Sequence, residues 1–86
     1  MATQQAISFE DVRAERKRTA TQRHIILGRL LKGRATNIEL YEHALNLTAR
    51  ISELRKQGHV IKVVARDYAT GIVWYALFVD GLEVAA

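Results

Sequence analysis

The sequence predicts a small α+β domain in which helices come first and a β-hairpin follows. Up to Gly58 apolar residues recur at helical spacing. Beyond it the chain has a period of two and is rich in β-branched and aromatic residues. The chain has 86 residues, 49% of them apolar and 26% charged, which is typical of one globular domain. We expect that domain over residues 19–84, after a charged N-terminal arm over residues 1–18.

The arm carries charges of both signs and few large apolar side chains. Segments of this kind are commonly solvated, so we expect disorder or a short helix with Ser8 as its N-cap. Its charged residues are Glu10, Asp11 and Glu15 against Arg13, Arg16, Lys17 and Arg18, and its large apolar residues are Ile7, Phe9 and Val12.

The first helix is expected to begin at Thr19, because Thr19 and Gln22 have the spacing of a capping box. Gly33 is expected to end it, since glycine adopts the left-handed backbone that follows many helices. Its inward stripe consists of Ile26, Leu27, Leu30 and Leu31.

The second helix is short and begins at another capping box, formed by Thr36 and Glu39. We expect it to run to about Ala44, with an apolar side turned inward. The residues expected on that side are Ile38, Tyr41 and Leu45.

A tight turn leads to a third helix, over residues 48–57, which ends before Gly58. Leu47, Ile51 and Leu54 are spaced so that they lie on one buried face. Strands are then expected over residues 60–65 and 72–78, with turns at 67–71 and 80–81 and a short edge strand over 82–84. This order predicts a winged helix-turn-helix: a three-helix core with a C-terminal β-hairpin wing.

Burial of the apolar stripe turns a face of small polar residues on the third helix outward. Such a face fits the major groove of DNA, where short side chains allow close approach to the base edges. The excess of 13 Lys and Arg over 9 Asp and Glu also favours an anionic partner. We expect Thr48, Ala49, Ser52 and Lys56 to face bases, Arg50 and Arg55 to contact phosphate or brace the helix, and Lys62 and Arg66 to hold the DNA backbone through the wing.

Further phosphate contacts are expected from Arg34, from the start of the second helix at Asn37, and from the basic residues of the arm. Glu53 is expected on the outer half of the third helix, where its carboxylate repels phosphates but can accept from a cytosine amino group or orient Arg50. The alternative, that Thr48 only caps the helix, Ser52 is solvated and Glu53 pairs locally, stays open.

The second strand is apolar on both faces, and a two-stranded wing buries only one of them. The other face needs a cover, which is either the apolar part of the arm or a second copy of the chain. A homodimer is favoured because a two-fold pair doubles the length of DNA that is contacted. The expected interface residues are Ile72, Trp74 and Phe78.

Two blocks of sequence carry a resemblance to a known family. Residues 36–40 are TNIEL and residues 49–61 are ARISELRKQGHVI. Together they resemble small winged helix-turn-helix proteins of phages and prophages, whose patterns are T-N-x-E-L and A-R-I-x-E-L-R-x-x-G-[HY]-x-I. The similarity covers roughly residues 21–78 and implies a DNA-binding transcriptional regulator in the cytoplasm of a bacterial host.

The sequence lacks the residues and motifs that metal binding, catalysis or insertion into a membrane would need. The chain has no cysteine and its histidines come from separate elements, so we expect no metal site. The glycines are scattered and neither serine has a nucleophile elbow, so we expect no enzyme, no cofactor and no small-molecule substrate. No apolar segment is long enough for a membrane helix. The alternative function is a protein-interaction module, such as a phage inhibitor of a host protein.

Overall fold

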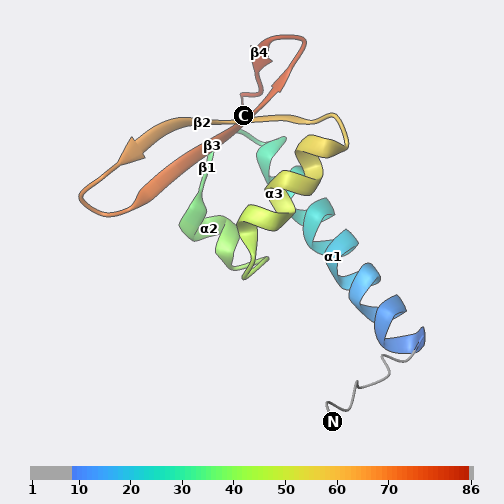
Figure 1. The fold of residues 1–86 in the computed structure, drawn as a ribbon. Helices are drawn as coiled ribbons and strands as arrows, with labels where there is room; N and C mark the ends of the chain where they lie inside the picture. Colours follow the sequence, from blue (N-terminus) through green and yellow to red (C-terminus); the bar gives the residue numbers. More distant parts are fainter. Residues whose placement is uncertain (1–8, 86) are drawn as a thin grey trace.

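The computed structural model describes residues 9–85, with side chains described from residue 13. It is an α+β molecule with three helices, as the sequence predicts, and its antiparallel sheet has four strands, so that it is compatible with a winged helix. The helices lie together on one side of the sheet (Figure 1). The elements are α1 (Phe9–Leu30), β1 (Ala35–Thr36), α2 (Asn37–Tyr41), α3 (Leu47–Lys56), β2 (Val60–Asp67), β3 (Ile72–Val79) and β4 (Leu82–Glu83).

Helix α1 begins at Phe9, so the expectation that it begins at Thr19 is wrong. Thr19 lies within the helix, and its hydroxyl donates to the carbonyl oxygen of Arg16 at 3.1 Å, as a mid-helix threonine commonly does. Residues 9–18 contain no glycine or proline, and Glu15 pairs with Arg18 one turn later. This part of the expected arm is therefore helical, while Ser8 lies outside the described residues.

Helix α2 is shorter than expected and turns a different side inward. The hydroxyl of Thr36 accepts from the backbone N–H of Glu39 at 3.1 Å, which confirms the N-cap. The helix ends at Tyr41, however, and the buried residues here are Leu40 and Ala44. The expectation that Ile38, Tyr41 and Leu45 face inward is wrong, since Ile38 is 58% exposed and Leu45 is 94% exposed.

The pairing of β1 with β3 explains this orientation. Thr36 is both the N-cap of α2 and the residue of β1 opposite Trp74. The direction in which α2 leaves the sheet is therefore fixed before the helix begins. In that direction Leu40, rather than Ile38, meets the core.

Helix α3 has the predicted buried stripe of Leu47, Ile51 and Leu54. It begins one residue earlier than expected, because Asn46 is its N-cap and accepts from the backbone N–H of Ala49 at 3.4 Å. Gly58, with a φ of 101°, ends the last turn. The N–H groups of Gly58 and His59 donate to the carbonyls of Arg55 and Leu54, both at 3.1 Å, which is a Schellman motif.

In the sheet β3 pairs with all three other strands, β2 on one side and β1 and β4 on the other. The two-residue strand β1 was not predicted. Asp80 and Gly81 both have positive φ, which makes the tight turn that their sequence predicts and starts β4 where expected. The core fills the space between the helices and the inner face of the sheet. Its largest members are Ile26, Leu30, Leu40, Leu47, Ile51, Leu54, Ile61 and Leu77.

The observed side of α2 predicts a contrast between two substitutions. Leu40→Ala removes a fully buried side chain and is expected to lower the free energy of unfolding by about 2–5 kcal/mol. Ile38→Ala, two residues earlier on the exposed side, is expected to change it by about 0.5 kcal/mol or less. Urea denaturation of the two variants measures both values. A larger loss from Ile38→Ala would contradict the observed packing.

Candidate nucleic-acid interface

The side of α3 opposite the buried stripe is open to solvent. Thr48 and Lys56 are exposed, and Ala49 and Ser52 are partly exposed. Since Asn46 caps the helix, the hydroxyl of Thr48 is not used as the N-cap. These four residues therefore lie together, as the sequence predicts. We refer to Thr48, Ala49, Ser52 and Lys56 as the α3 outer face.

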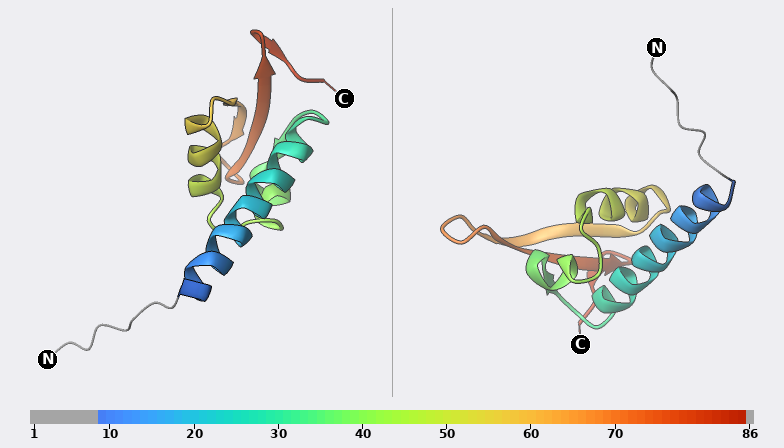
Figure 2. Two further views of the ribbon diagram at one scale, coloured as in Figure 1. Left: turned by 90° about the vertical axis from the view of Figure 1, so that its right-hand side faces the viewer. Right: turned by 90° about the horizontal axis from the view of Figure 1, so that it is seen from below.

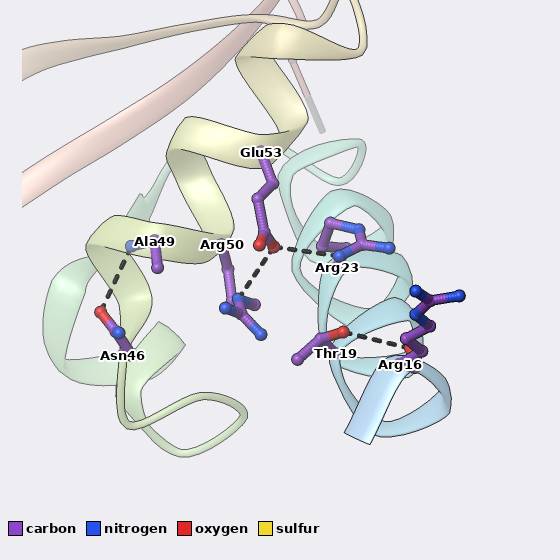
Figure 3. Close-up of polar contacts among 7 residues, drawn as sticks. All are labelled: Arg16, Thr19, Arg23, Asn46, Ala49, Arg50 and Glu53. Atoms are coloured by element: carbon purple, nitrogen blue, oxygen red, sulfur yellow. Dashed lines mark hydrogen bonds and ion pairs between the residues drawn. The ribbon is translucent and has the colours of Figure 1, made fainter. Parts of the chain in front are cut away.

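Glu53 lies on the outer half of α3, as expected, but at the edge of the α3 outer face, and its side chain is 36% exposed. Its carboxylate is directed toward α1, where Arg23 donates from Nη1 to Oε1 at 3.0 Å (Figure 3). The Nε of Arg50 lies 3.0 Å from the same oxygen. The carboxylate thus pairs with two guanidinium groups, of which Arg50 is a local partner, as the alternative expects, and Arg23 comes from a distant part of the chain. The only acidic side chain of α3 is directed away from the outer face.

Arg50 and Arg55 hold α3 from its two sides. The Arg50 side chain is only 12% exposed and lies between α3 and α1, beside Glu53. Arg55 donates from Nε to the carbonyl oxygen of Ile61 in β2 at 2.9 Å. Of the two roles expected for these arginines, the geometry supports bracing of the helix. The α3 outer face is therefore presented by a helix fixed to α1 on one side and to the sheet on the other.

Lys62 and Arg66, which were expected to contact DNA through the wing, lie on opposite faces of the β2–β3 hairpin. Ile61 pairs with Leu77 in the core, so the next residue, Lys62, points to the sheet face away from the helices. There its ammonium lies 4.9 Å from the centroid of the Phe78 ring. The structure does not bring Lys62 to the side of α3.

Arg66 reaches the helix side because the pairing is irregular. A bulge between Val63 and Ala65 shifts the register, so that Ala65 lies opposite Trp74 and Arg66 opposite Val73. Val73 shares the inner face with Leu77, since side chains alternate along a strand. Without the bulge, Arg66 would share the face of Lys62.

Arg34 and Asn37 have structural partners away from the α3 outer face. Arg34 donates to both carboxylate oxygens of Glu83, at 2.7 and 2.9 Å. The amide of Asn37 donates to the carbonyl of Gly71 at 3.1 Å and accepts from the N–H of Val73 at 3.0 Å. Arg34 therefore ties the start of β1 to β4, and Asn37 ties α2 to the hairpin.

Two residues that organise this site were not identified from the sequence. Arg23 pairs with Glu53 thirty positions later, and no local pattern marks a pair of that separation. Asn46 was not predicted to be the N-cap of α3, although an asparagine just before an apolar helical stripe is a recognised signal of a helix start.

The expected dimer face is partly open. Trp74 is 38% exposed, while Ile72 and Phe78 are partly buried. Helix α1 leads away from the sheet toward its N-terminal end, so the described part of the arm does not cover this face (Figure 1). The homodimer stays a prediction.

Comparison with protein-family models, curated proteins and solved structures finds no significant match. Within residues 9–85 no cluster of three or more His, Cys, Asp or Glu side chains is arranged to hold a metal ion. No helix among the described residues is long and apolar enough to cross a membrane. The interpretation of the α3 outer face therefore rests on its own geometry and on the sequence patterns.

The cluster of Glu53 with two arginines predicts a stability effect. Glu53→Gln leaves Arg23 and the mostly buried Arg50 without their shared anion, and we expect the free energy of unfolding to fall by about 1–2 kcal/mol. Glu42→Gln removes an exposed carboxylate and is expected to change it by about 0.5 kcal/mol or less. Chemical denaturation compares the two. Equal effects would contradict the bridging role of Glu53.

The exposed pair of Arg34 and Glu83 predicts a pH dependence. Hydrogen bonding from Arg34 lowers the pKa of Glu83 below its ordinary value of 4.5. The pair therefore stabilises the folded state at pH values above 4.5, and this contribution is lost as the pH falls through the lowered pKa. The stability difference between the wild type and Glu83→Gln is expected to shrink below pH 4.5. Arg34→Gln serves as the matched variant, and a difference independent of pH in thermal melts would refute the assignment.

Proposed function

We propose that the chain is a small phage-type transcriptional regulator that binds double-stranded DNA sequence-specifically, with α3 in the major groove of a winged helix-turn-helix complex. The observation that carries the proposal is the α3 outer face. It is open, small and polar, and the one carboxylate of its helix is held against α1 by Arg23 and Arg50. No acidic group of α3 thus stands between this face and a phosphate backbone.

The residues of the α3 outer face suit contact with base edges. The major groove is about 12 Å wide and admits one helix. Ala49 and Ser52 are short enough to let the helix backbone approach, and the hydroxyls of Thr48 and Ser52 both donate and accept hydrogen bonds. Lys56 reaches guanine acceptors or phosphate from the last turn.

Among the other residues that were expected to contact DNA, one stays in the proposed contact set and the others have structural roles. Arg66 lies on the helix side of the β2–β3 hairpin, where a hairpin acting as a wing contacts the DNA backbone. Arg50 and Arg55 brace α3, and Arg34 and Asn37 hold the sheet and α2 in place. The proposed contact set is therefore the α3 outer face together with Arg66, and regulation follows from occupancy of the site rather than from catalysis.

A homodimer through the face of Ile72, Trp74 and Phe78 is part of the proposal. A single α3 contacts few base pairs, and a two-fold pair would read two half-sites about one helical turn apart. Selection of bound fragments from a random DNA pool tests this directly. A palindromic site supports the dimer, and a single short site supports a monomer.

Two carboxylates on the α3 outer face are expected to abolish DNA binding. Ser52→Glu with Lys56→Glu places negative charge against the phosphates and removes two base-edge groups, each worth roughly 1–3 kcal/mol. We expect binding of the selected duplex to weaken by about 100-fold or more without loss of the fold, as measured by fluorescence titration at moderate salt and by circular dichroism.

The matched control is Lys32→Glu with Ala85→Glu, which changes the net charge by the same amount. These positions follow the C-terminal ends of α1 and of the sheet, on the side of the molecule away from α3 (Figure 2). The control is expected to weaken binding far less. Equal losses would show that only total charge matters. Retention of binding by the α3 variant would exclude this face as the DNA-binding surface.

The protein-interaction alternative is favoured by one observation, the partly open apolar row that includes Trp74 on the outer face of the sheet. Steeply salt-dependent binding to duplex DNA supports the regulator. Tight, salt-insensitive binding to a purified host protein, lost in Trp74→Ser, supports the alternative.

A further inference from the structure

The N-terminal half of α1 projects from the body of the molecule as a continuous helix. The C-terminal half is anchored in the core by Ile26 and Leu30, which are fully buried. Beyond Arg23, which pairs with α3, the residues toward the N-terminus are mostly exposed. The helix nevertheless continues without interruption from Leu30 back to Phe9 (Figure 1).

One side of this projecting half is basic. Arg13, Arg16 and Lys17 are all exposed, and their spacing of three and four residues places them on the same side of a helix. Glu15 is directed elsewhere. It pairs with Arg18, and both line a groove against Asn46 at the start of α3.

The projecting half lies beside α3 on the side of the molecule that the α3 outer face presents. Both views in Figure 2 show the N-terminal end of α1 reaching the level of α3, and the right-hand view shows the β2–β3 hairpin extending on the other side of α3. Helix α3 therefore lies between two elements that reach the same side of the molecule. One is the hairpin with Arg66, and the other is the basic half of α1.

Helix geometry sets how far this second element reaches. Arg23 is fixed to Glu53 on α3, and at 1.5 Å per residue Arg16 and Arg13 lie about 10 and 15 Å farther along the axis. This distance corresponds to roughly three to four base pairs at 3.4 Å each. Because the helix is anchored at Arg23, the charges are held at a set distance from the α3 outer face.

We propose that the basic side of α1, formed by Arg13, Arg16 and Lys17, is a second contact with the DNA backbone, which extends the bound region by three to four base pairs beyond the α3 outer face. The inference rests on the proposed function and adds to it an interaction surface and a fixed geometry. It assigns these residues to the phosphate backbone rather than to bases, because long basic side chains on an exposed helix bind phosphate irrespective of sequence.

The experiment compares the full-length chain with Arg16→Gln/Lys17→Gln on a selected duplex of about four helical turns. Each phosphate contact contributes roughly −0.9 to the slope of log affinity against log salt concentration. We expect the slope of the variant to be smaller in magnitude by roughly 2 for each bound protomer. Hydroxyl-radical footprinting is expected to show protection shortened by roughly three to four base pairs at each end of a two-fold site, or at one end of a site bound by a monomer, with the centre unchanged.

The matched control is Lys32→Gln/Lys62→Gln, which removes two charges at positions that face away from the α3 outer face. It is expected to keep the slope and the footprint of the wild type. A third variant, Ala20→Gly/Thr21→Gly, keeps the charges but weakens the helix at two exposed positions, by about 1 kcal/mol at Ala20 and by less at Thr21. We expect it to lose the sharp outer edge of the footprint.

The outcomes separate this inference from the function on which it rests. If the wild type binds no duplex, the proposed function fails and the inference fails with it. If the wild type binds and the Arg16→Gln/Lys17→Gln variant matches the control in slope and footprint, the inference alone is overturned. If the glycine variant keeps the full footprint, the fixed geometry is refuted.

Discussion

The arrangement of this molecule depends on one carboxylate oxygen shared by two guanidinium groups. Oε1 of Glu53 lies 3.0 Å from Nη1 of Arg23 and 3.0 Å from Nε of Arg50. The contact joins α1 to α3 beside their shared core and directs the only negative charge of α3 toward α1. It also sets the point from which the N-terminal half of α1 projects. The orientation, charge and reach of the candidate interface therefore follow from the same contact.

A second set of contacts fixes the other side of α3. Thr36 caps α2 while pairing with β3, and the amide of Asn37 holds the end of the β2–β3 hairpin. Arg55 joins α3 to β2. Short elements such as β1 and α2 do not bury enough area to be stable alone, and their positions are set by these connections. The hairpin and α3 thus behave as one unit with a defined spacing.

The sequence predicted those features that depend on local spacing. The stripe of Leu47, Ile51 and Leu54 spans two turns, and Asp80-Gly81 has a strong turn preference, so both were correct. The inward side of α2 was wrong because five residues do not complete two turns, and its direction comes from the pairing of β1 with β3. Thr19 was misread because a threonine and a glutamine three residues apart also fit the interior of a helix. The partner of Glu53 comes from a distant part of the chain, which local patterns do not reveal.

The bulge in β2 makes the chemistry of the hairpin depend on pairing register rather than on composition. Because the extra residue lies between Val63 and Ala65, regular pairing of β2 with Val64 included would turn every residue nearer the tip to the opposite face. Arg66 would then exchange sides with its neighbours although no charge had been added or removed. The bulge alone thus decides on which surface of the protein this cation lies.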